Sequence, residues 1–79
     1  MESSSYPQGN PYLLWVIDQK GNFRRLYAPF KVQVIWPVGT FSTGTWVYVE
    51  KIWDSKKCPI IFKIFDKWYC FRHFKIPLN

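Results

Sequence analysis

Apolar and polar side chains alternate along most of this chain with a period of two residues. The cleanest alternation covers residues 30–36, where four apolar side chains share one face of a strand: Phe30, Val32, Val34 and Trp36. Further runs rich in β-branched and aromatic residues cover 12–17, 23–27, 45–53 and, in two arms, 60–76. No stretch of ten residues carries the 3.6-residue apolar period of a helix. The pattern predicts an all-β fold of five to six short antiparallel strands.

The segment between the first two strands predicts a hairpin. Asp18 opens it and Gly21 occupies a position that suits a type I turn followed by a bulge. If Asp18 pairs with Asn22, Ile17 lies opposite Phe23 and the rest of the register follows. Both faces of this hairpin are then largely apolar, so the pattern does not decide which face is the core.

The strand over 45–53 requires an irregularity. Val47 and Val49 fall on its inward face, and Ile52 joins them only if a bulge lies near Lys51. Across all strands the alternation predicts a core of eight side chains: Phe30, Val32, Val34, Val47, Val49, Phe62, Ile64 and Phe71.

The segment 60–76 is predicted to form the terminal hairpin, with Asp66-Lys67 as a two-residue turn. In this register six side chains share one face: Ile61, Lys63, Phe65, Trp68, Cys70 and Arg72. The other face carries six more: Ile60, Phe62, Ile64, Tyr69, Phe71 and His73. A three-residue turn would instead place Trp68 inside and Tyr69 outside. Either register leaves one mixed aromatic and basic face.

The two cysteines are predicted to be free thiols. With Asp66-Lys67 at the turn, Cys70 lies opposite Lys63, roughly 16 Å along the strand from Cys58, whereas a disulfide needs Cα atoms within about 7 Å. Free thiols are consistent with a reducing compartment.

Composition divides the chain in two. Residues 1–11 are rich in Ser, Pro, Gly and Asn and lack periodicity, so we predict that they form a flexible tail. We expect residues 12–79 to form a single β-barrel domain. Aromatic residues make up 22% of the chain, more than so small a domain can bury. Some rings must therefore face a ligand, solvent or a second subunit, and a homodimer is expected.

The order of predicted elements over 12–76 resembles an SH3-like barrel: a long first hairpin, a strand, a glycine-bearing loop, a strand and a terminal hairpin. Closure into a small barrel would remove exposed strand edges. An OB-like barrel is the alternative, weakened because the chain lacks a helix between the third and fourth strands.

Candidate catalytic and metal-binding chemistry is sparse. Cys70 and His73 lie three residues apart, so on a strand they point to opposite faces and cannot share a metal ion. His73 is the only histidine, and Asp18, Asp54 and Asp66 fall in predicted turns, where Asp bonds its own backbone. We predict no metal site, no cofactor and no catalytic residue.

One enzyme family offers a partial resemblance. Val32-Gln33-Val34-Ile35 is similar in its first two residues to the Val-Gln-Ile-Tyr strand motif of plasmid-type dihydrofolate reductases, SH3-like chains that build a shared pore as tetramers. In that family the motif lies near the C-terminus, whereas here it lies on a middle strand. An oligomeric enzyme with a shared pore therefore ranks last among three functional hypotheses.

The first hypothesis is a nucleic-acid-binding module. Residues 55–79 hold six of the eleven Lys and Arg and one of the five acids, which gives them a net charge of +5 out of +6. Cations that follow a phosphate backbone beside rings that stack on bases are typical of single-strand binding. The predicted contacts all lie in the terminal hairpin: Lys63, Phe65, Lys67, Trp68, Tyr69, Arg72 and His73.

The second hypothesis is a protein-interaction or self-assembling adaptor. Trp46, Tyr48 and Trp53 would form a groove for an extended or proline-rich peptide of a protein partner. Grooves of that kind usually carry acidic loop residues, of which this chain has few.

The expected location is cytoplasmic, with no membrane partner. No apolar run approaches the ~18 residues of a membrane span, and the N-terminal residues lack the basic flank and apolar segment of a secretory signal.

Overall fold

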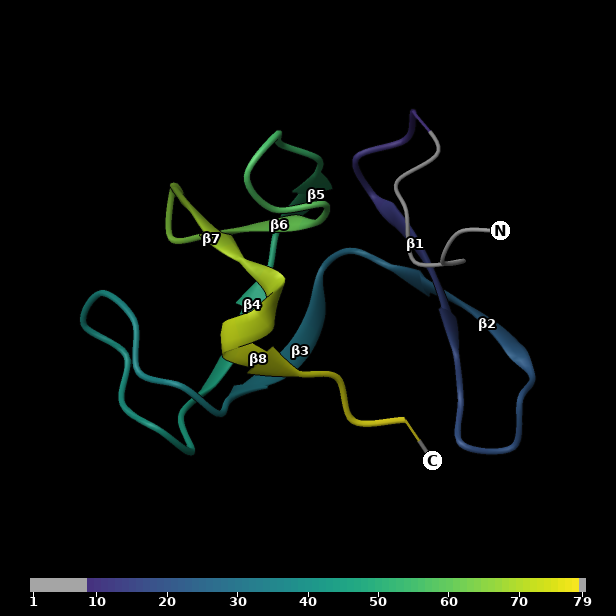
Figure 1. The fold of residues 1–79 in the computed structure, drawn as a ribbon, viewed down its shortest axis with the longest axis horizontal. Coiled ribbons are helices and arrows are strands. Elements are labelled where there is room, and N and C mark those ends of the chain that lie inside the picture. Colours follow the sequence, from purple (N-terminus) through teal and green to yellow (C-terminus); the bar gives the residue numbers. More distant parts are fainter. Residues whose placement is uncertain (1–8, 79) are drawn as a thin grey trace.

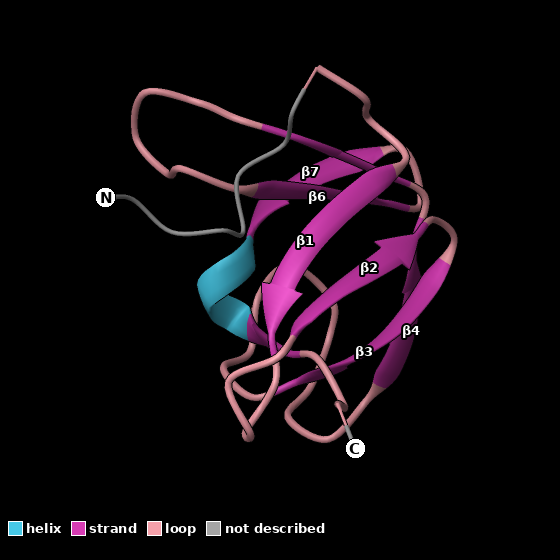
Figure 2. Ribbon diagram, turned by 90° about the vertical axis from the view of Figure 1, so that its right-hand side faces the viewer, coloured by secondary structure: helices cyan, strands magenta, loops and turns pink. Residues whose placement is uncertain are grey.

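A computed structural model describes residues 9–78, which form eight β-strands and one 3-10 helix. The first four strands are β1 (Leu13–Ile17), β2 (Phe23–Tyr27), β3 (Phe30–Val34) and β4 (Trp46–Val49). They are followed by β5 (Lys51–Trp53), β6 (Ile61–Ile64), β7 (Lys67–Cys70), η1 (Phe71–His73) and β8 (Phe74–Lys75). The predicted all-β class is confirmed (Figures 1 and 2).

The strands form three small antiparallel sheets with the orders β1-β2, β4-β3-β8 and β5-β6-β7. The β1-β2 hairpin lies to one side of the two three-stranded sheets in Figure 1. Within residues 9–78 none of these sheets closes on itself, so the structure shows an all-β fold without the closed barrel of the SH3-like prediction.

The first hairpin has the predicted register. Ile17 pairs with Phe23, and Asp18 N–H donates to the Asn22 carbonyl at 2.9 Å. The Asp18 carboxylate also accepts from the N–H groups of Asn22 and Lys20, each at 2.9 Å, and from Arg24 at 3.4 Å. These bonds, that of Asn22 above all, hold the pKa of Asp18 below its usual value.

Strand β3 is shorter than predicted. It ends at Val34, and the next two N–H groups, of Ile35 and Trp36, both donate to the His73 carbonyl, at 2.8 and 3.2 Å. Trp36 therefore leaves the strand and is 59% exposed, so the prediction that it shares one face with the buried Val32 and Val34 is wrong.

The irregularity predicted near Lys51 is present one residue earlier. Glu50 separates β4 from β5, and its N–H donates to the Lys63 carbonyl at 2.8 Å. The interruption shifts the alternation by one residue, so that Val49 and Ile52 are both completely buried. One continuous segment thereby pairs with β3 through β4 and with β6 through β5.

The core receives side chains from all three sheets. Of the eight predicted core residues, six are buried and two, Phe30 and Phe71, are partly buried against them. The prediction omitted five other buried members of this cluster: Leu14, Val16, Ile52, Ile60 and Phe74. Leu14 and Val16 identify the inward face of the first hairpin, which the sequence left open.

The turn of the terminal hairpin lies one residue before its predicted place. Ile64 pairs with Lys67, so Phe65 and Asp66 form the turn, both with positive φ (50° and 65°). A positive φ is rare for a residue as bulky as Phe65. The Phe65 N–H donates to Glu50 Oε2 at 2.9 Å, and this bond stabilises the turn. Trp68 then lies opposite Lys63 and Cys70 opposite Ile61.

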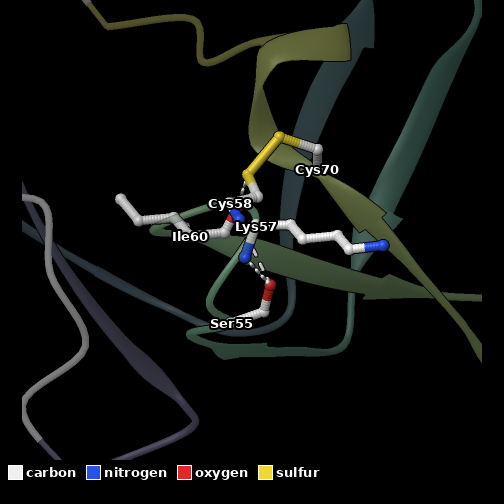
Figure 3. Close-up of a disulfide and its surroundings, with 5 residues drawn as sticks. All are labelled: Ser55, Lys57, Cys58, Ile60 and Cys70. Carbon is white, nitrogen blue, oxygen red and sulfur yellow. Dashed lines mark hydrogen bonds between the residues drawn. A yellow bond between two sulfur atoms is a disulfide. The ribbon is translucent and has the colours of Figure 1, made fainter.

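The prediction of two free thiols is wrong, because Cys58 and Cys70 form a disulfide with Cα atoms 5.9 Å apart (Figure 3). The actual register moves Cys70 two residues closer to Cys58 along β6. A turn then brings Cys58 back toward the hairpin, because Ser55 N–H donates to the Cys58 carbonyl at 3.0 Å. Ser55 Oγ accepts from the N–H groups of Lys57 and Cys58, each at 3.2 Å.

The last predicted strand is broken at Phe71–His73. The 3-10 turn η1 leads the chain away from β7 and into β8, which pairs with β3 instead of continuing the hairpin. The pair Val34 and Phe74 brings the Phe74 side chain into the core. A single straight strand over residues 67–75 could not pair with both β6 and β3.

The predicted tail covers residues 1–11. Its first eight residues lie outside the described residues, as does Asn79. Of the remainder, Asn10 Oδ1 accepts from Tyr12 N–H at 2.9 Å, and the Pro11 carbonyl accepts from Ile52 N–H at 2.7 Å. The second of these bonds attaches the chain before β1 to the edge of β5.

Candidate nucleic-acid interface

The side of the β5-β6-β7 sheet that faces away from the core carries cations and rings together. Lys51 pairs with Lys63, and Lys63 pairs with Trp68, so these three side chains form one row across the sheet. Trp53, Ile61 and Cys70 form the neighbouring row. We call this surface the outer face and define it by five residues: Lys51, Trp53, Ile61, Lys63 and Trp68.

Both tryptophans of the outer face are accessible, with Trp53 44% and Trp68 45% exposed. The ammonium groups are only weakly engaged. Lys63 Nζ lies 3.9 Å from Asp66 Oδ1, whose side chain is 91% exposed, and such ion pairs contribute little in water. Lys51 Nζ lies 5.8 Å from the centroid of the Tyr12 ring, which adds a third ring beside this face.

Two of the predicted contact residues lie near the tip of the hairpin. Phe65 is 71% exposed, and its ring centroid lies 6.1 Å from that of Phe41. Lys67 is exposed at the start of β7. Because side chains alternate along the strand, Lys67 lies on the same side of the sheet as Tyr69 and on the opposite side from Trp68. Phe65 and Lys67 therefore lie at the tip of the hairpin, outside the outer face.

Tyr69 is turned toward the interior. Its ring packs against Phe41 at 5.4 Å and Phe74 at 6.3 Å between centroids. A Cβ at Gly39 would lie 3.2 Å from the Tyr69 ring, so the 38–41 loop approaches this ring closely. Tyr69 holds that loop against the sheet and is not available for stacking on a base.

Arg72 and His73 lie on η1, away from the row of Lys51, Lys63 and Trp68. The Arg72 guanidinium is 5.9 Å from the Phe71 ring centroid. His73 Nδ1 lies 3.3 Å from the Trp36 carbonyl oxygen, and the two rings meet edge to face at 6.4 Å. His73 thus links the end of β3 to η1, a structural contact.

The sequence prediction missed Lys51, Trp53 and Tyr12. A signal for the first two existed, because an irregularity that turns Ile52 inward also turns its neighbours outward. Tyr12 had no such signal, since its position depends on the bond from Ile52 to Pro11.

Residues 9–78 contain no group of three His, Cys, Asp or Glu side chains that could hold a metal ion. In the same part of the chain no helix has the length and apolar character needed to cross a bilayer.

Comparison of the chain with models of protein families, with curated proteins and with solved structures gave no match.

Proposed function

We propose that this chain binds single-stranded nucleic acid on the outer face of the β5-β6-β7 sheet. The observation that carries the proposal is the row of Lys51, Lys63 and Trp68 on three adjacent strands. Neighbouring strands are about 4.8 Å apart, so the two ammonium groups and the indole lie within reach of one or two nucleotides.

The chemistry of the row suits this ligand. Lysine side chains neutralise phosphates without reading sequence, and exposed indoles stack on any base. The contact between Lys63 and Asp66 is long and the Asp66 side chain is almost fully exposed, so a phosphate can replace that carboxylate. Trp53 lies two residues from Lys51 along β5 and provides a second stacking surface.

Replacing Trp68 by alanine is expected to weaken binding by about 5- to 150-fold, since one base loses its stacking partner. Lys63→Ala is expected to reduce the dependence of log K on log salt by about 0.7, the value for one phosphate contact on a single strand. Fluorescence anisotropy of a labelled mixed pool of single-stranded DNA and RNA, titrated at two salt concentrations, measures both effects.

The β3-β4 sheet supplies matched controls. Trp46 is 48% exposed, and Lys31 Nζ lies 5.2 Å from its ring centroid, so this pair resembles the outer face in composition. Trp46→Ala and Lys31→Ala should leave the affinity unchanged. Equal losses at both sheets, or no binding tighter than about 100 µM at the lower salt concentration, would contradict the proposal.

A cytoplasmic location and a homodimer stay predictions. Disulfides persist in oxidising compartments, so the Cys58–Cys70 bond removes the support that free thiols lent to a reducing location. The exposed rings still favour association, and equilibrium sedimentation at high micromolar concentration tests it. A monomer under those conditions would exclude the homodimer.

A further inference from the structure

Strand β2 has an open edge. Among residues 9–78 it pairs only with β1. Two backbone hydrogen bonds show which residue pairs of β1 and β2 are the hydrogen-bonded ones. Asp18 N–H donates to the Asn22 carbonyl and Ala28 N–H to the Tyr12 carbonyl, both at 2.9 Å. Hydrogen-bonded pairs alternate along an antiparallel ladder, so three residues of β2 direct their N–H and C=O groups away from β1: Phe23, Arg25 and Tyr27.

The side chains of the same three residues are exposed. Phe23 is 63% and Tyr27 58% accessible, and Arg25 lies between them on the side of the hairpin opposite the core. The Arg25 guanidinium carbon is 5.6 Å from the ring centroid of Trp15, its partner across the ladder. The edge of β5 differs, because the Pro11 carbonyl occupies the Ile52 N–H.

We propose that Phe23–Tyr27 binds an extended acidic segment of a partner protein, which adds to the β1-β2 sheet as a third, antiparallel strand. The partner would place Asp or Glu opposite Arg25, and apolar β-branched or aromatic residues two positions before and after it, opposite Phe23 and Tyr27. Its backbone would bond the outward N–H and C=O groups of β2.

Charge favours such a partner over a second copy of this chain. In the two-fold alignment that keeps Phe23 opposite Tyr27, each Arg25 would face the Arg25 of the other copy. Like charges directly opposite each other destabilise a strand pair. The net charge of +6 adds a general preference for an acidic partner.

The test uses the full chain and a labelled peptide, acetyl-Thr-Val-Thr-Glu-Thr-Val-Thr-amide. Anisotropy should show saturable binding below about 1 mM, and a peptide with Lys in place of Glu should bind about two- to fivefold more weakly. The R25E variant should reverse that order. Methylation of the Glu backbone nitrogen should abolish binding, because that N–H would donate to the Arg25 carbonyl.

A matched control is Lys31→Glu, because β3 is paired on both edges by β4 and β8. This change should leave peptide binding as it is. Amide exchange should show new protection at Phe23, Arg25 and Tyr27 on addition of the Glu peptide. Equal binding of the methylated peptide, or no protection at these amides, would overturn the proposal. Protection that depends on protein concentration without peptide would overturn it in favour of a second copy.

Discussion

Phe62→Ala is expected to lower the free energy of unfolding by about 3–5 kcal/mol, the usual cost of removing a buried aromatic ring. The Phe62 side chain is 1% exposed, and its ring lies 5.8 Å from that of Phe30 and 5.9 Å from that of Phe74. The cavity would therefore open where the β5-β6-β7 sheet meets the β4-β3-β8 sheet. A chain of 79 residues has a total stability of about 4–12 kcal/mol, so this loss removes about a quarter of it or more.

Urea denaturation followed by circular dichroism measures this loss. Tyr48→Ala is the control, because Tyr48 is 59% exposed on the adjoining strand β4 and should change stability by less than about 1 kcal/mol. Similar losses for the two variants would contradict the placement of Phe62 at the centre of the core.

Removal of the disulfide is the second large effect. The double variant Cys58→Ala, Cys70→Ala should lose about 3 kcal/mol, because the bond closes a short loop and restricts the unfolded chain. The two cysteines are separated by 12 positions. For a domain of this size the loss corresponds to a fall in Tm of about 12–24 °C.

Thermal unfolding with and without a reducing agent measures this effect and provides its control. The reducing agent should lower the Tm of the natural chain and leave that of the double variant unchanged. Two thiols titrated in the unreduced, denatured chain would show instead that the bond does not form.

The first hairpin could be predicted because its signals are local. Asp18 and Gly21 define the turn, and the register of five residue pairs follows from them. The second hairpin lacks such a signal, since Asp66-Lys67 is a more usual turn sequence than Phe65-Asp66. The bond that stabilises the actual turn comes from Glu50, 15 positions away. An error of one residue in the turn moved Cys70 away from Cys58 and concealed the disulfide.

The candidate site was predictable in part for the same reason. Alternation over the first arm of the terminal hairpin places Lys63 on the face away from the core, and a two-residue turn at either Asp66-Lys67 or Phe65-Asp66 keeps Trp68 on that same face. Arg72 was assigned to the site because the strand was expected to continue through it, and Tyr69 and His73 were assigned because a three-residue turn would place them on the outside. The change of direction at η1 arises from the pairing of β8 with β3, which is not encoded locally.

That pairing also bears on the order in which the fold is acquired. The hairpins β1-β2 and β6-β7 join residues close in the chain, whereas Gln33 and Lys75 lie about forty positions apart. The entropy of closing a loop rises with its length, so local hairpins can form before β8 docks. Two-stranded hairpins are marginal alone, and β8 contributes Phe74 to the shared core. The short strand β8 is thus expected to dock late and to complete a core that the local hairpins leave open.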